Sequence, residues 1–560
     1  MRRWRTILST AGCAGVVAGL AGQAGTPPGA PLHYVVAEAT IEPLARPVAG
    51  GNTVLRVRFS NRTRPPLRMP YATEGGTVVL ADDGTGLDAR AGDGLYTALG
   101  SLDLVAFGDR LVRLSRSQTA MPLRTYRTRA RVETGARLDP STFVAGRQYP
   151  YEPWGDPAAI SPSRSLLIRH LSVVEDATRT RASCGQASTG IWSFGYLMEQ
   201  MANTPFTGVT ASQFTRQWLD TWMTNQVVNG WTVQNRSLMQ AQILDAWIAA
   251  SGGPGMPLDL SRAPFKLQAI VNRLDLRHQG AYGGSSGGEL RFVFLFMPDN
   301  DCTTGKAFQV ILEFGVPASG CVNQQAYAQQ WKNLDTLPIG SAAYNAALEA
   351  ITQQVVVAGA GMGKANGSAL NQIRVNENLL DDTGGGLDWQ FREFVIDPLS
   401  HHLTMATLAQ TPGAGVSKAT QLGPYVNANE DAILADDYVV PLAYPAGVKF
   451  RAGGLVYSSL VFWSAPAIAN PDARHRFAVN TCNGCHTKET DTEFSHVGRA
   501  GFGTTAPLSG FLTGVWVPDP ANATADHHFD DLERRALDLE TFLGTSCFAS
   551  PLDLPLFASH

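Results

Sequence analysis

The residues best suited to chemistry lie near the C-terminus, where the chain reads Cys482-Asn483-Gly484-Cys485-His486. In a C-x-x-C-H sequence the two thiols can add across the vinyl groups of one haem, and the adjacent imidazole can bind its iron. With 7 cysteines and 11 histidines in 560 residues, random order would produce the pattern with a chance of roughly one in 700. The sequence therefore predicts one covalent haem c held by Cys482 and Cys485, with His486 as proximal ligand.

Three other uses of this motif stay open. The two cysteines could form a local disulfide, act as a thiol redox pair or contribute to a metal site. A thioredoxin-like pair normally sits at the start of a helix in a βαβ unit, and no strand pattern precedes Cys482. Zinc would need further ligands, which Cys547 and a histidine could supply, although their spacing is not diagnostic.

The N-terminus has the pattern of a secretory signal peptide. Three arginines precede a charge-free run over residues 6–22, which ends in small residues. This run is too short and too rich in glycine to cross a membrane comfortably, so residues 1–24 are expected to be cleaved. The segment ending at Cys13 resembles a lipoprotein signal, but Cys13 lies too early for us to expect a lipid anchor. A periplasmic, secreted or cell-surface location follows.

Cysteine usage agrees with export. Four cysteines remain besides Cys13 and the haem motif, and an oxidising compartment would allow two disulfides. Cys302 and Cys321 each follow a strand-like run, which favours a bridge between them. A bridge between Cys184 and Cys547 follows only by elimination, and buried free thiols are the alternative.

Composition limits the remaining function classes. The formal net charge of −4 offers no basic surface for nucleic acid. The 44% hydrophobic and 16% charged content predicts packed domains rather than disorder. About 535 residues after cleavage correspond to two to four domains. No later run has the length and apolar character of a transmembrane helix.

Short alternating runs separated by turns predict a β-sandwich over residues 31–135. Residues 53–59 alternate with period two, and residues 77–80 form a compact apolar run. The aspartate- and glycine-rich stretch 82–96 resembles a signature of immunoglobulin-like modules in secreted bacterial proteins. Its carboxylates could bind Ca²⁺, but the spacing is not that of an EF-hand, and Asp-Gly pairs are common in turns. We favour turns over Ca²⁺.

The mixture of helix and strand patterns in residues 136–465 predicts an α+β domain. Amphipathic helices are expected at 192–201 and 214–227, with strands around Phe292 and Val310. No nucleophile elbow, P-loop or zinc-protease motif occurs in the sequence, so no activity can be assigned beyond a haem-linked oxidoreductase.

Two polar clusters in this domain stand out, at residues 272–278 and 371–377. Alternating polar residues at a strand end can form a pocket for a small polar ligand. The alternative, which we favour, is a hydrogen-bonded network of Arg, Asp and Asn that holds long loops.

Residues 466–548 place a helix, the C-x-x-C-H motif, a glycine-rich loop and a second helix in order. The first helix is expected at 471–480, and the second at 528–543, with Asp526 as its cap and Gly544 at its end. This order resembles a small class I cytochrome c domain, and the resemblance implies an all-α haem domain.

The resemblance also implies a sixth iron ligand after the motif, which in this family is commonly methionine. The last methionine here is Met405, so His496 is predicted as the ligand and His528 is the second choice; a histidine there lowers the reduction potential. His475 could reach the haem edge, although solvent exposure is expected. An open position and Met405 stay as alternatives, and the further histidines after the motif are His527 and His560.

The sequence thus predicts three parts: an N-terminal β-sandwich, a central α+β domain and a C-terminal all-α cytochrome c-like domain. The expected function is one-electron transfer by an exported haem protein, in which the haem relays electrons from the central domain to a redox partner. The alternative is a secreted ligand- or partner-binding protein. In that case the haem is structural or sensory, or Cys482 and Cys485 form a disulfide.

Overall fold

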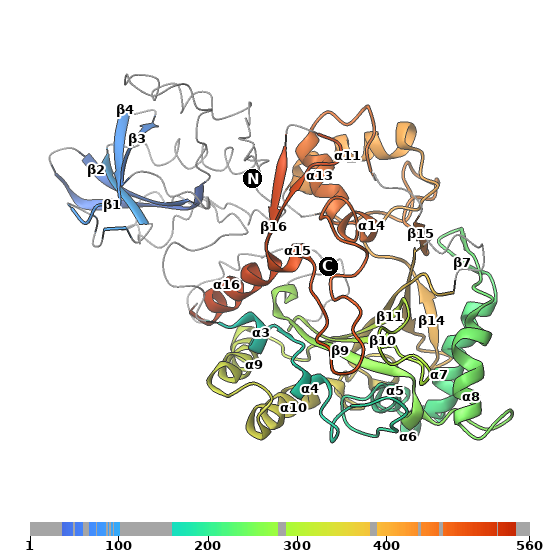
Figure 1. The fold of residues 1–560 in the computed structure, drawn as a ribbon. Helices are drawn as coiled ribbons and strands as arrows, with labels where there is room; N and C mark the ends of the chain where they lie inside the picture. Colours follow the sequence, from blue (N-terminus) through green and yellow to red (C-terminus); the bar gives the residue numbers. More distant parts are fainter. Residues whose placement is uncertain are drawn as a thin grey trace, which may run out of the picture.

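A computed structural model describes most of the chain from residue 160 to residue 544 and several strands before it (Figure 1). Among these residues, no helix has the length and apolar character needed to span a bilayer. The described residues are 36–48, 51–59, 67–73, 76–85, 88, 91–92, 95–100, 160–277, 287–380, 389–434, 438–457, 463–522 and 525–544.

The N-terminal strands form one five-stranded antiparallel sheet in the order β1-β2-β5-β4-β3. The strands predicted at 53–59 and 77–80 are confirmed as parts of β2 and β4. The later part of the predicted sandwich, residues 101–135, lies outside the described residues. The bounds are β1 Val36–Val48, β2 Gly51–Phe59, β3 Arg68–Thr73, β4 Gly76–Ala81 and β5 Leu95–Gly100.

The aspartates of the following loop serve the turn. Asp83 accepts a hydrogen bond from the Thr85 backbone N–H at 3.0 Å, and Asp88 accepts one from the Gly84 N–H. This is the local side-chain to backbone bonding expected of turn aspartates. Asp93 lies outside the described residues, so the Ca²⁺ alternative stays untested.

The centre of the molecule is an eight-stranded antiparallel sheet. Seven strands follow the order β14-β13-β12-β11-β10-β9-β6, and β15 pairs with β13 beside β14. The strands expected around Phe292 and Val310 are confirmed as β10 and β11. The bounds are β6 Leu167–Ile168, β9 Phe265–Arg273, β10 Glu289–Phe296, β11 Phe308–Gly315, β12 Leu370–Glu377, β13 Trp389–Ile396, β14 Leu403–Ala406 and β15 Leu455–Tyr457.

One face of this sheet is apolar and carries the main hydrophobic core. Successive side chains of a strand point to opposite faces, so β10 directs Phe292 and Phe294 to this side. Helix α5 packs Phe194 against Phe265 with ring centroids 4.2 Å apart and against Phe294 at 5.4 Å. Offset contacts between aromatic rings of this kind stabilise the layer.

Helices α4, α5, α7 and α10 contact the sheet, and α9 packs beside α10. The predicted helices at 192–201 and 214–227 are confirmed in α5 and α7, although the second ends at Asp220 and a short hairpin, β7–β8, follows. The bounds are α3 Pro162–Ser165, α4 Leu171–Val174, α5 Phe194–Ala202, α6 Thr204–Thr207, α7 Ala211–Asp220, β7 Gln226–Val228, β8 Trp231–Val233, α8 Asp245–Ala250, α9 Cys321–Asn333 and α10 Ala342–Val356.

The C-terminal region is not the all-α domain that the sequence predicted. It contains the two-stranded sheet β16–β17 and only a few helices, and its residues belong to the same hydrophobic core as the central sheet. Its later elements lie beside that sheet in Figure 1. The bounds are α11 Gly423–Ala428, α12 Glu430–Leu434, α13 Pro471–Val479, α14 Cys482–Cys485, α15 Gly510–Thr513, β16 Val515–Pro518, β17 Asp526–Phe529 and α16 Asp531–Gly544.

The last helix explains why the cytochrome-like arrangement fails. Its apolar stripe is present as expected, with Leu532, Ala536 and Leu539 buried, but α16 packs on α9, α15 and α3 of the molecule. It also begins later than predicted, because residues 526–529 extend as β17 and Asp530 accepts the Glu533 backbone N–H at 3.3 Å.

The predicted bridge between Cys302 and Cys321 is wrong, because Cys302 bonds to Cys184. Cys321 is itself disulfide-bonded. Cys547 lies outside the described residues.

Candidate functional site

The C-x-x-C-H motif is held by two short helices. Helix α13 begins at Pro471, as the sequence predicted, and Asn470 caps it. Thr481 then caps α14 by accepting the Gly484 backbone N–H at 3.1 Å. The Trp463 Nε1–H donates to Thr481 Oγ1 at 2.8 Å, which fixes this turn from outside. Buried polar groups with such partners hold a loop in one conformation.

Both cysteines of the motif are buried, and neither is in a disulfide, so the local disulfide is not formed. Cys482 packs with Phe391 and Leu408, and its backbone N–H donates to Thr411 Oγ1 at 2.9 Å. Burial raises the pKa of the Cys482 thiol, although the charge of nearby Arg374 opposes this. The thiol is therefore neutral near pH 7.

His486 is oriented so that its Nε2 is available to a metal. Its Nδ1–H donates to the carbonyl oxygen of Phe494 at 2.5 Å. Asn376 of β12 donates to the same oxygen at 2.6 Å and so positions the carbonyl from the sheet. Burial lowers the pKa of His486 to about 4, which keeps the imidazole neutral. A hydrogen-bonded Nδ1 and a free Nε2 are the usual state of a metal-binding histidine.

His496, the predicted sixth ligand, lies beside the motif. Its ring centroid is 4.6 Å from that of His486, and its Nε2 is 3.4 Å from Cys485 Sγ. Its Nδ1 contacts Ser509 Oγ at 2.9 Å, which holds the ring from behind. The structure therefore brings together all four predicted site residues, Cys482, Cys485, His486 and His496.

The other candidate ligands lie elsewhere. Met405 is on β14, and His527 and His528 are on β17; none of them lines the cavity described below. His475 is buried rather than solvent-exposed, with 4% of its surface accessible, so that expectation is wrong. His560 lies outside the described residues.

A cavity of about 130 Å³ separates the motif from the central sheet. One wall is the sheet and the other is the C-terminal region. The lining includes Cys482, His486, His496, Leu512, Phe391, Leu408, Val293, Ile311, Gln309, Glu313, Asn376, Arg273, Arg291, Arg374 and Arg535.

The segment after the motif crosses the sheet and closes this cavity. Asn376 of β12 binds the carbonyl of Phe494, and Gln309 of β11 donates to that of Val497 at 2.7 Å. Gln268 of β9 then donates to the Ala500 carbonyl at 3.0 Å. The polar side chains of three strands therefore satisfy the backbone of one crossing segment.

The polar clusters at residues 272–278 and 371–377 were predicted to form either a ligand pocket or a structural network, and the structure shows residues of both kinds. Arg273 and Arg374 line the cavity, as a pocket requires. In contrast, two other residues form buried ion pairs with α16, as a structural network requires. Asp275 pairs with Arg534 at 2.5 Å, and Arg277 pairs with Asp538 at 2.5 Å.

Sequence reasoning missed the charged row of the sheet. Arg291 of β10 pairs with Glu289 at 2.6 Å and with Glu313 of β11 at 3.3 Å; Arg374 of β12 pairs with Glu313 and, at 3.1 Å, with Glu393 of β13. The available signal was the alternation of charged and aromatic residues in strands 289–296 and 308–315, which indicates a strand buried on both faces, one of them polar.

The donor set of the motif suits a covalently bound haem. Cys482 and His486 line the cavity together with Phe391, and Cys485 lies beside His496. The arginines of the sheet face pair with glutamates of the same face, and guanidinium groups of this kind also bind carboxylates such as the two that a haem carries.

Removing the His496 imidazole tests the sixth ligand. In the haem-loaded chain we expect a low-spin bis-imidazole spectrum, and His496→Ala should convert it to a high-spin spectrum because one axial nitrogen is lost. Visible absorption and electron paramagnetic resonance measure the change. His528→Ala, on β17, should leave the spectrum unchanged, whereas an unchanged spectrum in His496→Ala would exclude His496 as the ligand.

No family model, curated protein or solved structure matches this chain. Because a fold alone does not specify a function, the chemistry of the cavity and its motif is the basis for a functional assignment.

Proposed function

We propose that this protein is an exported c-type haem protein that transfers single electrons. The observation that carries the proposal is the state of the C-x-x-C-H motif. Neither cysteine is in a disulfide, and the hydrogen bond from His486 Nδ1 to Phe494 leaves Nε2 available at the wall of the cavity.

Each residue has a defined task in this proposal. Cys482 and Cys485 form the thioether bonds, and His486 holds the iron. Phe391 and Leu408 pack against Cys482 and keep water from the attachment point. The haem supplies a one-electron couple, whose potential depends on its axial ligands and its burial.

The central sheet acts on the haem directly in this proposal, rather than as a separate electron-donating domain. Its charged row, with Arg291 and Arg374, lines the cavity opposite the motif. The row carries the charges of these two arginines together with those of three glutamates, and charges near a redox centre shift its potential. The sheet therefore tunes the potential and binds the haem carboxylates.

Export is part of the proposal, because attachment at C-x-x-C-H takes place outside the cytoplasm. The Cys184–Cys302 disulfide supports an oxidising compartment, where such bonds persist. The predicted signal peptide, residues 1–24, lies outside the described residues.

The test is a covalent haem assay on full-length chain exported through a c-type maturation pathway. We expect one haem per chain by pyridine haemochrome, a haem-staining band on a denaturing gel, and a one-electron reversible redox titration. Cys482→Ala/Cys485→Ala should lose all covalent haem, because both thioether bonds are removed.

The matched control removes two other cysteines. Cys184→Ala/Cys302→Ala should keep covalent haem, since this bridge lies outside the motif, although its stability should fall by about 2–4 kcal/mol. Absence of covalent haem from the unaltered chain would overturn the proposal.

A further inference from the structure

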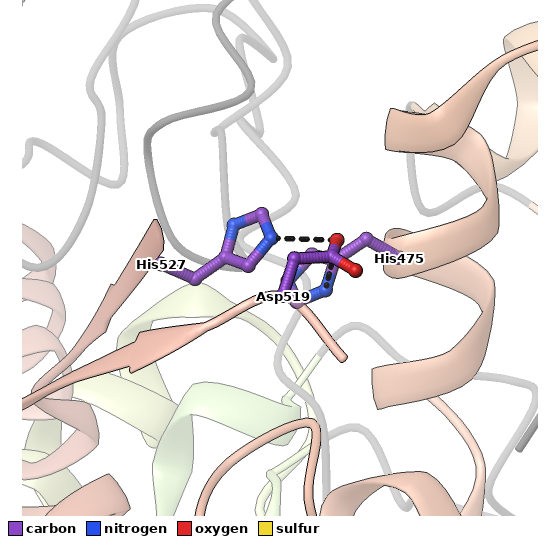
Figure 2. A group of neighbouring side chains, drawn as sticks. All are labelled: His475, Asp519 and His527. Carbon is purple, nitrogen blue, oxygen red and sulfur yellow. Dashed lines mark hydrogen bonds and ion pairs between the residues drawn. The ribbon is translucent and has the colours of Figure 1, made fainter. Parts of the chain in front are cut away.

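A second cluster of potential ligands includes one residue of helix α13, the helix that precedes the C-x-x-C-H motif. His475 comes from α13, Asp519 directly follows β16, and His527 lies on β17. Figure 2 shows both imidazoles beside the Asp519 carboxylate. All three are buried, with 4%, 4% and 2% of their surfaces accessible. We call these residues the two-histidine cluster.

The spacing of the donor atoms matches a metal site. Asp519 Oδ2 is 3.0 Å from His527 Nε2 and 3.7 Å from His475 Nδ1, and all candidate donor atoms lie within 4.8 Å of one another. Ligands at 2.0–2.1 Å from a tetrahedral zinc ion are about 3.4 Å apart. The observed distances lie on either side of this value.

Neighbouring groups hold the donors in place. Arg474 Nη2 contacts both carboxylate oxygens of Asp519 at 2.8 Å. The backbone N–H groups of Ala521 and Asn522 donate to Asp519 Oδ1 at 2.8 and 2.9 Å. Oδ1 is therefore engaged by the backbone, whereas Oδ2 faces the histidines. Such outer contacts orient the ligands of protein metal sites.

The charge of the cluster also favours a cation. Glu489 Oε2 lies 2.8 Å from His475 Nδ1, and Arg474 pairs with both Glu489 and Asp519. The two carboxylates thus share one guanidinium. A divalent cation between the imidazoles and Asp519 would add positive charge beside both carboxylates.

We propose that His475, Asp519 and His527 bind one divalent transition-metal ion of the zinc or iron type. Two imidazole nitrogens and one carboxylate suit these ions, whereas Mg²⁺ and Ca²⁺ prefer oxygen ligands only. The site uses no residue of the C-x-x-C-H motif and so does not depend on the haem.

Its position nonetheless links it to the cavity. The ring of His496 contacts Phe511 at 4.7 Å, Phe511 contacts Phe529 at 5.4 Å, and Phe529 contacts His475 at 6.3 Å between centroids. The metal would therefore stabilise the β16–β17 hairpin on the wall that also supports His496.

The test measures Zn²⁺ binding to the full-length protein after treatment with a chelator. Isothermal titration calorimetry should give one tightly bound Zn²⁺ per chain, and Mg²⁺ should not compete. His475→Ala and His527→Ala should each weaken binding by about 100-fold or more, since loss of even an outer contact costs 10–100-fold. His528→Ala removes the adjacent histidine of the same strand and should bind normally.

A second measurement, of thermal stability, tests the proposal if the alanine variants fold poorly. Zn²⁺ should raise the Tm of the unaltered protein, because a ligand that binds only the folded state stabilises it, and His527→Gln should lack this rise. Titration of the Cys482→Ala/Cys485→Ala chain separates the two proposals, since it should bind Zn²⁺ without haem. Equal Zn²⁺ affinity of the unaltered, His475→Ala and His527→Ala proteins would overturn the inference.

Discussion

Replacing Asp275 by asparagine is expected to lower the free energy of unfolding by about 3–5 kcal/mol, because it removes one partner of a buried ion pair. Asp275 is 3% exposed and accepts from Arg273 at 2.9 and 3.1 Å and from Arg534 at 2.5 Å. The substitution keeps the shape of the side chain. The lost free energy of unfolding therefore measures the contribution of the Asp275 charge, which joins α16 to the sheet. Urea unfolding followed by tryptophan fluorescence measures it.

The pH dependence gives this prediction a second check. Burial alone would raise the pKa of Asp275, but the charges of Arg273 and Arg534 hold it well below its usual range. Its contribution is therefore present above the unfolded pKa, about 3.9, and is lost as the pH falls below it. The difference between the two proteins should shrink in acid.

The control is an exposed ion pair on the surface of α7. Arg216 and Asp220 are 2.8 Å apart with 37% and 43% of their side chains accessible, and Asp220→Asn should change stability by less than about 1 kcal/mol. An equally small effect of Asp275→Asn would show that the ion pairs do not hold α16 in place.

Replacing Gly484 by alanine should destabilise the protein by about 1–3 kcal/mol, as overpacking does, and should lower the yield of attached haem. A methyl group there would overlap the carbonyl oxygen of Ala478 and lie 2.6 Å from its carbonyl carbon. These are backbone atoms at the end of α13, so they cannot turn away. The motif must shift instead, which misplaces Cys482 and Cys485.

Haem per chain and urea unfolding measure the two effects. Gly544→Ala is the matched control, since no atom lies within 4 Å of its added methyl group, and it should be close to neutral. Normal haem content and stability in Gly484→Ala would contradict the close packing of α13 on α14.

Local structure followed from the sequence. The strand-like runs around Phe292 and Val310 correspond to β10 and β11. Pro471 begins α13, and the apolar steps of the last helix bury Leu532 and Leu539. These features depend on neighbours a few positions apart, which share a face of a helix or strand whatever the rest of the chain does.

The partners of those faces did not follow from the sequence. The stripe of α16 could pack on any apolar surface, and it packs on α9, α15 and α3, so the expected all-α domain is absent. Likewise, Cys302 had several cysteines to pair with, and the tertiary structure brings it to Cys184.

By itself, the sequence determined the type of chemistry, because C-x-x-C-H places two thiols and an imidazole next to one another along the chain. Only the tertiary structure decided their surroundings. It brought Asn376 of the sheet to the carbonyl that orients His486, and it joined His475 to His527 from 52 positions away. Contacts between distant segments depend on how whole surfaces fit together, and no local pattern encodes them.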